Sequence, residues 1–443
     1  MRYVLRLWLH ILLLTLLMAA HDLMASVSFE NTAGLSKITL GGDARLRMES
    51  RENDDFNDHL DDNDTYFLTR VRVFADVEVN DLIRAYVRLR DAELFEADIP
   101  HGNPAYEDSL DLYEGFLEIR KPMDLPLRVQ IGRLEFNYGE QRLIGGFDWS
   151  NVGRQFDALR LIATPGNFEV HAFAANRVII DDHNFNRSDP HEAPDDFYGI
   201  YTMYHGFSER ELEGYILLRQ NRQVKASAED GSLGDLDEYT IGTRTVGKYL
   251  TDFDYGTELA YQFGNGYGDR IKAYAIHFRT GYTFPGLDWK PRIGVEYNQG
   301  SGDKNPTDGR NQGFDNLFPT NHPHYGYIDA ISWRNTRNYA LSFKVNPMKD
   351  LMVKMDLWNF RLKEARDALY GAGGKVTRRD TTGHSGKDAG QEIDLLVQYK
   401  LNQHWSFLGG YSYFIAGDFI EDAPPQKTGD NADFSYVQVM YTF

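Results

Sequence analysis

The sequence contains no cysteine and, after its first two dozen residues, no long hydrophobic run. The absence of cysteine excludes disulfides and fits a protein exported to a cell envelope. With a mean hydropathy of -0.50, the rest of the chain holds no segment that could cross a membrane as a helix. Basic residues are the minority, because 47 Lys and Arg stand against 66 Asp and Glu, a net charge of -19 at pH 7. This balance argues against a nucleic-acid partner, which would favour clustered positive charge.

The one hydrophobic run of helical length lies at the start of the chain. A basic beginning is followed by residues 7–20, which are almost wholly apolar, and by a small-residue cleavage site after Ala25. This order of features is typical of a secretory signal peptide. We therefore predict a signal peptide over residues 1–25 and a single domain over residues 26–443. The alternative for the first segment is a retained anchor helix.

Two strand-length runs joined by a polar turn extend from Arg70 to Arg90. Successive side chains on a strand point to opposite faces. One face of this hairpin carries Val71, Val73, Ala75, Val77, Val79, Ile83, Ala85, Val87 and Leu89. The other face carries Arg70, Arg72, Asp76, Glu78, Arg84, Tyr86, Arg88 and Arg90. Taken alone, the hairpin also suits a soluble sandwich, whereas a membrane barrel requires the same alternation along the whole chain.

The alternation does recur, in segments rich in aromatic residues. We predict eighteen strands, at residues 35–48, 66–79, 83–94, 110–121, 127–138, 156–164, 167–178, 196–205, 212–220, 237–247, 253–263, 271–284, 289–299, 336–345, 350–362, 390–400, 405–415 and 433–443. Most have nine to fourteen residues, close to the length that a tilted strand needs to cross a bilayer.

The connections between these strands alternate between short and long. Tight turns rich in Pro, Gly, Asn and Asp are predicted at residues 80–81, 122–126, 164–166, 285–288, 346–347 and 401–404. Longer polar loops are predicted at residues 49–65, 95–109, 139–155, 179–195, 221–236, 300–335, 363–389 and 416–432. Short turns at one end and long loops at the other are typical of outer-membrane barrels. The sequence therefore predicts an all-β fold, a transmembrane antiparallel up-and-down β-barrel.

The last predicted strand ends on an aromatic residue, Phe443. Val437, Val439 and Tyr441 lie on the same face of this strand. Such a terminal strand resembles the sorting signal that the barrel-assembly machinery of Gram-negative bacteria reads. We therefore expect this machinery, outer-membrane lipid and lipopolysaccharide as partners.

Seven arginines fall on the predicted inner face of three consecutive strands: Arg45, Arg47, Arg70, Arg72, Arg84, Arg88 and Arg90. Their planar guanidinium groups suit recognition of carboxylates or phosphates. Acidic residues share this sector, at Asp43, Asp76, Glu78, Glu114 and Glu118. The arginines therefore either bind an anion or form a lattice of salt bridges with these carboxylates, and the two roles are compatible.

A longer pattern occupies residues 132–161. It consists of Gly132-Arg133 at its start, Asp148-Trp149-Ser150-Asn151 in its middle and Phe156-Asp157-Ala158-Leu159-Arg160-Leu161 at its end. A second block, residues 314–326, reads Phe-Asp-Asn-Leu-Phe-Pro-Thr-Asn-His-Pro-His-Tyr-Gly. Together the two blocks resemble the alginate export family of outer-membrane proteins.

This resemblance implies a monomeric barrel of eighteen strands whose arginine-lined pore passes the polyanion alginate. The positions that match the family's motif arginines are Arg133, Arg142, Arg154 and Arg160, with Asp148 and Asp157 as their acidic partners. We therefore expect a passive channel for an anionic saccharide or a related organic anion in a Gram-negative outer membrane, with no catalysis, metal or cofactor. A general diffusion porin is the alternative.

Three further features have two interpretations each. The acidic loop at residues 49–65 is either solvated, with divalent ions bridging it to lipopolysaccharide, or a calcium site, although it lacks the Gly and terminal Glu of a calcium-binding loop. The pair His322 and His324 either packs within its loop or binds a metal. The residues His171, Ser150 and Asn151 could belong to a hydrolase at the barrel rim, although no nucleophile motif surrounds them.

Overall fold

The computed structural model describes residues 27–443 except 33–34, 58, 60, 99–103, 183, 189–194, 230 and 425–428. The predicted signal peptide lies outside these residues. Within the part of the chain that is described, no helix is both long and apolar enough to span a membrane.

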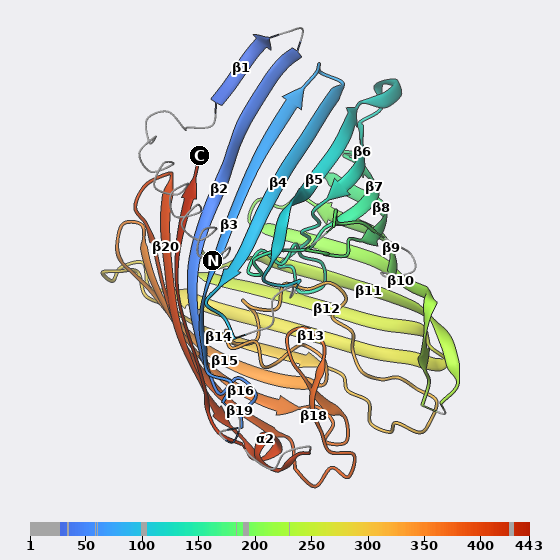
Figure 1. The fold of residues 1–443 in the computed structure, drawn as a ribbon, viewed down its shortest axis with the longest axis vertical. Coiled ribbons are helices and arrows are strands. Elements are labelled where there is room, and N and C mark those ends of the chain that lie inside the picture. Colours follow the sequence, from blue (N-terminus) through green and yellow to red (C-terminus); the bar gives the residue numbers. More distant parts are fainter. Residues whose placement is uncertain are drawn as a thin grey trace.

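Eighteen antiparallel strands form the wall of the molecule (Figure 1). They are β2 (Leu35–Glu52), β3 (Asp64–Glu78), β4 (Ile83–Phe95), β5 (Asp108–Arg120), β6 (Leu127–Leu134), β7 (Phe156–Ala163), β8 (Phe168–Arg177), β9 (Asp195–Tyr204), β10 (Arg210–Ser227), β11 (Leu233–Tyr249), β12 (Phe253–Gly266), β13 (Asp269–Thr283), β14 (Arg292–Gly300), β15 (Thr336–Met348), β16 (Leu351–Leu362), β19 (Asp388–Lys400), β20 (Trp405–Ala416) and β21 (Ala432–Thr442). Each pairs with the next wall strand, and β21 returns to pair with β2. The wall is therefore a closed barrel, as predicted.

The remaining elements are short. Strand β1 (Val27–Thr32) pairs with the first residues of β2. A two-stranded sheet of β17 (Ala368–Tyr370) and β18 (Val376–Arg379) and the helix α2 (Asp418–Asp422) lie in two of the long loops, and the 3-10 turn η1 (Pro122–Asp124) joins β5 to β6.

All eighteen predicted segments correspond to wall strands, and the differences lie at strand ends. Residues 221–236, predicted as a loop, are mostly strand, because β10 continues to Ser227 and β11 begins at Leu233. Polar side chains do not prevent this extension, since the ladder uses main-chain groups. Arg222 of β10 and Asp237 of β11 form an ion pair of 2.7 Å between the two strands. In contrast, the predicted strand at residues 127–138 ends at Leu134.

Alternation gives the wall an apolar outer face and a polar inner face. In the β3–β4 hairpin, Val73 and Val87 are 41% and 44% exposed, whereas the neighbouring Arg72 and Arg90 are 8% and 0% exposed. The arginines are covered from the inside of the barrel, because their partners lie on a loop within it. The two faces predicted for this hairpin are confirmed.

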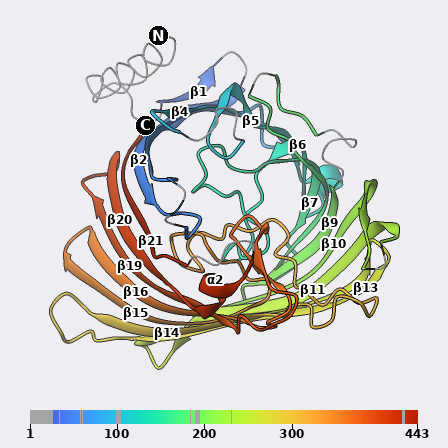
Figure 2. The same cartoon turned by 60° about the horizontal axis from the view of Figure 1, so that its bottom comes forward.

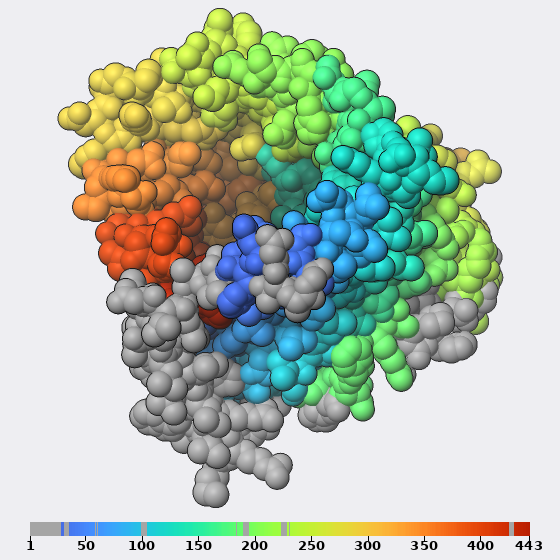
Figure 3. Space-filling view, turned by 90° about the horizontal axis from the view of Figure 1, so that it is seen from above, coloured from blue at the N-terminus to red at the C-terminus, as the bar shows by residue number. Residues whose placement is uncertain are grey.

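Two long connections fold into the barrel, as the view along it shows (Figure 2). We call residues 135–155 the first inner loop and residues 301–335 the second inner loop. They are joined to each other by main-chain hydrogen bonds from Gly145 N to Phe318 O at 2.8 Å, from Phe318 N to Leu143 O at 2.9 Å and from Thr320 N to Gln141 O at 2.8 Å. Seen from the end with the short turns, the molecule is hollowed between the wall strands (Figure 3).

Packed aromatic side chains attach the inner loops to the wall. The ring centroids of Phe136 and Phe156 lie 5.1 Å apart, and those of Phe197 and Phe318 lie 4.9 Å apart. These four side chains are at most 4% exposed. Because buried aromatic rings dominate the energetics of a core, this cluster holds both loops in place within the lumen.

Candidate functional site

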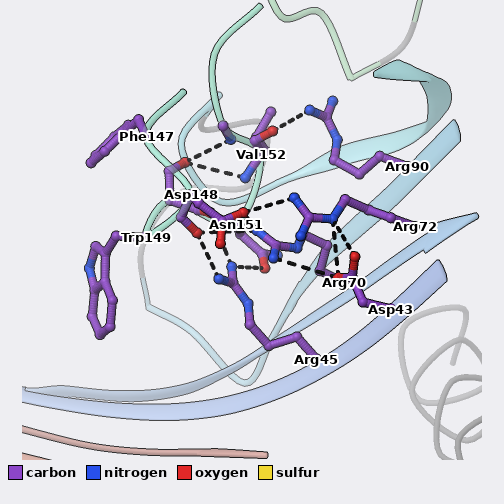
Figure 4. Close-up of polar contacts among 12 residues, drawn as sticks. Asp43, Arg45, Arg70, Arg72, Arg90, Phe147, Asp148, Trp149, Asn151 and Val152 are labelled. Carbon is purple, nitrogen blue, oxygen red and sulfur yellow. Dashed lines mark hydrogen bonds and ion pairs between the residues drawn. The ribbon is translucent and has the colours of Figure 1, made fainter. Parts of the chain in front are cut away.

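Arginines of β2 and β3 hold the first inner loop by its main chain (Figure 4). Arg45 donates from Nη1 to the carbonyl of Asp148 at 2.9 Å and from Nη2 to the carbonyl of Ser150 at 3.0 Å. Arg47 donates to the carbonyl of Trp149 at 2.9 Å. A buried carbonyl needs a hydrogen-bond donor. These guanidinium groups supply donors to three consecutive carbonyls of the loop.

The Asp148 carboxylate bridges two further arginines. It lies 3.0 Å from Arg70 and 2.8 Å from Arg72. On the wall, Arg72 also pairs with Asp43 at 2.9 Å. Burial alone would raise the pKa of Asp148, but Arg70 and Arg72 hold this pKa well below its usual range. The loop carboxylate therefore stays ionised and belongs to a network that reaches the wall.

Arg90 completes the attachment of this loop. Its guanidinium pairs with Asp108 and donates to the carbonyl of Val152, and both charged side chains are at most 1% exposed. Five of the seven predicted wall arginines, namely Arg45, Arg47, Arg70, Arg72 and Arg90, thus bind the first inner loop. Their immediate role is to position this loop across the lumen.

The other two wall arginines lie nearer the short turns and pair with acidic residues of the wall. Arg84 contacts Asp76 at 2.7 Å, and Arg88 contacts Glu114 at 3.2 Å. Arg84 and Arg88 are 21% and 25% exposed along their side chains. In the same sector, Arg120 contacts Glu118 at 2.7 Å and Glu78 at 3.8 Å. This sector contains the salt-bridge lattice that the sequence left as one of two interpretations.

Arg133, expected in the pore, lies on the outer side of the wall. The register of β6 with β5 and β7 is continuous through Gly132, so Arg133 shares a face with the outward Ile131. There it pairs with Asp157 at 2.9 Å and donates to the carbonyl of Asn186. The prediction that Arg133 lines the pore is wrong, because no bulge turns it inward. Asp157 is its acidic partner, as expected from the resemblance.

Two other motif arginines occupy the lumen. Arg142 lies on the first inner loop and pairs with Glu296 of β14 at 3.0 Å, so it ties this loop to the opposite wall. Arg160 of β7 donates from Nε to the side-chain oxygen of Gln130 at 2.8 Å.

The fourth motif arginine, Arg154, lines a pocket of about 290 Å³ between the two inner loops and the loop that carries β17 and β18. Its walls are Phe147, Arg154, Arg219, Asp315, Asn316, Leu317, Pro319, Asn321, Ser332, Arg334, Ala372, Gly373 and Gly374. The lining thus contains three arginines and one aspartate. The charge of Arg219 is neutralised, because this arginine pairs with Asp315 at 2.7 Å and with Asp195 at 3.2 Å.

The other two pocket arginines form no ion pair among the described residues, although burial, which lowers the pKa of Arg334, is outweighed by nearby groups that include Asp367, Asp315 and Glu238. Arg154 donates to the carbonyls of Gly145 at 3.0 Å and Pro319 at 2.9 Å. Burial and the nearby Arg177 lower the pKa of Arg154 to about 9. Arg334 lies over the ring of Tyr370 at 4.3 Å, and its Nε is buried without a hydrogen-bond partner. The pocket is therefore positively charged and able to accept an anion.

Sequence reasoning missed Arg219 and Arg334. Arg219 could have been found by alternation, because it follows Tyr215 and Leu217 on the inner face of a predicted strand. Arg334 lies at the end of a loop, where no periodicity exists, and only the folded loop brings it to the pocket.

The residues considered for metal or catalytic chemistry lie apart. His322 stacks on Trp149 with ring centroids 3.6 Å apart and bonds to Asp329 at 2.8 Å, whereas His324 bonds to the carbonyl of Glu140 at 2.7 Å. His171 contacts Tyr138 at 3.0 Å and Glu169 at 2.7 Å.

The hydroxyl of Ser150 donates to the carbonyl of Ala105 at 2.7 Å, and the Asn151 amide donates to main-chain carbonyls, including Thr69 at 3.0 Å. Neither therefore contacts His171. In the acidic loop, Arg51 pairs with Asp54 at 2.9 Å. The described residues contain no group of three or more His, Asp or Glu placed to hold a metal ion.

A family model described as alginate export matches residues 36–432. The chain belongs to the alginate export family. This places it among outer-membrane β-barrels and agrees with the resemblance of residues 132–161 and 314–326. No curated protein matches this family member in sequence.

Solved porin structures share its fold at low sequence identity. OccAB4 of Acinetobacter baumannii superposes with a TM-score of 0.62 at 11% identity, covering 93% of this chain and 100% of that chain. OccK2 (OpdF) of Pseudomonas aeruginosa, solved with glucuronate, gives 0.61 at 12% identity, covering 94% and 99%. OpdK of the same organism, solved with vanillate, gives 0.59 at 9% identity, covering 91% and 98%. In this alginate export family member, the Asp-Trp-Ser-Asn motif is the segment that the wall arginines hold.

Proposed function

We propose that this protein is a passive channel of the Gram-negative outer membrane for an anionic saccharide or a related organic anion. The observation that carries the proposal is the pocket of three arginines and one aspartate in a chain whose net charge is -19. Membership of the alginate export family supports an anionic solute. The glucuronate and vanillate in two structural neighbours are both carboxylates, which favours the same chemistry.

Transport through such a pore needs attraction without trapping, because a solute must leave as readily as it enters. The inner face meets this need by mixing charges. Near the short turns, Arg84 and Arg88 each lie beside a carboxylate, yet both remain partly exposed. An anion could pass from one guanidinium to the next while the carboxylates weaken each contact. Diffusion down the solute gradient then drives transport, and no catalytic step is required.

The arginine-lined path can be tested by reversing charge. We expect the native protein in a planar lipid bilayer to prefer anions in a salt gradient, and Arg84→Glu combined with Arg88→Glu to shift the reversal potential toward cations. The matched control is Lys304→Glu combined with Arg310→Glu, two exposed residues of the second inner loop. An unchanged reversal potential in the first variant would contradict the proposed path.

We also propose that the protein works as a monomer, is inserted by the barrel-assembly machinery through its terminal strand, and contacts lipid and lipopolysaccharide. The C-terminal residue is well placed in the wall, since Phe443 N donates to Gly42 O at 3.0 Å and Gly42 N donates to Phe443 O at 2.8 Å.

A further inference from the structure

The pocket between the inner loops differs from the rest of the inner face in its charge balance. Wall arginines such as Arg72 and Arg88 have carboxylate partners. Arg154 and Arg334 form no ion pair among the described residues, and they line the same cavity. Asp367, Asp315 and Glu238 nearby partly compensate the charge of Arg334, whereas no carboxylate compensates that of Arg154. Removing a guanidinium from water without a counter-ion is costly. An oxyanion in the cavity would offset this cost for Arg154 and could also contact Arg334.

Uncharged polar side chains of the pocket indicate what else the occupant carries. Asn316, Asn321 and Ser332 line the same cavity as the two arginines. A guanidinium can bind an oxyanion, and amide and hydroxyl side chains can exchange hydrogen bonds with a hydroxyl group. Hydroxyl and oxyanion on one molecule describe a hydroxylated organic acid.

Part of the pocket lining is apolar. It consists of Phe147, Leu317 and Pro319, and the Phe147 ring lies 5.6 Å from the Arg154 guanidinium. A ring or short carbon skeleton can rest on such a surface beside a carboxylate that contacts the arginines. A bare inorganic anion would leave the apolar lining without contacts.

The size of the pocket limits the length of its occupant. Its volume of about 290 Å³ lies just below the range of about 300 to 1,000 Å³ that is usual for ligand pockets. Three main-chain hydrogen bonds join the two inner loops between residues 141–145 and 318–320. A polymer threading between the loops at this point would have to break them.

The geometry points to this pocket as a binding site for a monomeric sugar acid, held by Arg154 and Arg334 through its carboxylate and by Asn316 through a hydroxyl. This inference rests on the proposed function and narrows it, because the solute is then a single small acid and not a polymer. The pocket is a stopping point on the path and performs no chemistry.

The test is single-channel recording of the full-length mature protein with glucuronate added on the side of the long loops. We expect brief, saturable interruptions of the current. Arg154→Gln and Arg334→Gln should each weaken glucuronate binding by about tenfold or more, the effect of losing one charge-assisted hydrogen bond. The control Arg310→Gln, an exposed arginine of the same loop, should bind glucuronate as the native protein does.

A second variant tests the cavity without changing its charge. A side chain at Gly373 would meet no atom within 4 Å, so Gly373→Leu should fold and fill the pocket. We expect it to weaken glucuronate binding too. If glucuronate interrupts the current equally in the native protein, the arginine variants and Gly373→Leu, the pocket is not the binding site.

Two other solutes separate this inference from the proposed function. Glucose, which has the hydroxyls without the carboxylate, should cause no interruptions, and interruptions equal to those with glucuronate would overturn the assignment. A uronate trimer that binds where the monomer does not would overturn the single-acid assignment and leave the anion channel standing. Absence of anion preference in the native protein would instead contradict the proposed function itself.

Discussion

At the scale of single residues, the arginines inside this barrel have two different tasks. Arg45, Arg47 and Arg70 donate to main-chain carbonyls of the first inner loop, so their charge serves architecture. Arg154 and Arg334 line a cavity and form no ion pair among the described residues, although Arg154 also donates to the carbonyls of Gly145 and Pro319. Arginine suits both tasks because its rigid group of donors can bind carbonyls or an oxyanion. The residue type alone does not separate them.

The buried pair Arg90 and Asp108 allows the architectural task to be measured. Arg90→Met leaves Asp108 buried without its counter-ion, and we expect a loss of about 3–5 kcal/mol in the free energy of unfolding. Denaturant titration in detergent micelles would measure it. Adding Asp108→Leu should recover much of the loss, because no buried charge is then left unpaired. The control Arg222→Gln removes an arginine that is 54% exposed and should cost under about 1 kcal/mol. A loss for Arg90→Met as small as for this control would contradict the architectural role.

At the scale of elements, the barrel is closed by the seam between β2 and β21. Their pairing runs from Asp43 with Thr442 to Glu52 with Asp433. Beyond it, Gly42 and Phe443 exchange two main-chain hydrogen bonds. A Cβ at position 42 would lie 2.2 Å from the carbonyl oxygen of Arg72 and 2.7 Å from the Phe443 ring. Glycine is needed here because the last residue of the chain packs directly on the backbone of β2.

Gly42→Val tests this seam. The added side chain must push away main-chain atoms, so we expect most of the protein to fail to close. Closure is measured by the faster migration of the unheated barrel on a detergent gel. The control Gly409→Ala changes another wall glycine, where the nearest atom to the new Cβ is 3.7 Å away, and should close normally. Normal closure of Gly42→Val would show that the seam tolerates a displaced terminus.

At the scale of the whole molecule, the barrel and its inner loops form one packed body. The first inner loop contacts β2, β3 and β4 through the wall arginines and contacts β14 through Arg142. It also joins the second inner loop along residues 141–145. An internal structure tied at so many points is expected to remain in place while solute passes beside it.

A reversible cross-link can test whether the inner loops separate during transport. A Cβ built at Gly145 would lie 2.3 Å from the Thr320 hydroxyl, so cysteines at these two positions are near enough to be bridged. The native chain has no cysteine, so the two introduced cysteines can form a disulfide within the chain only with each other. We expect Gly145→Cys with Thr320→Cys to conduct equally when oxidised and when reduced, with each single variant as control. A current that appears only after reduction would mean that the loops part to open the channel.

The sequence by itself determined the wall, and only the tertiary structure decided the lumen. Alternation places Val73 and Arg72 on opposite faces whatever the rest of the chain does, because side-chain direction in a strand is a local property. The partners of Arg45 lie more than one hundred residues away, in a loop without periodicity. Whether Arg45 holds a loop and Arg334 faces a cavity depends on where that loop and its neighbours pack. Arg133 shows the same limit. Alternation alone cannot tell whether a strand is regular or bulged at Gly132, and the continuous pairing with β5 and β7 decided on which face Arg133 lies.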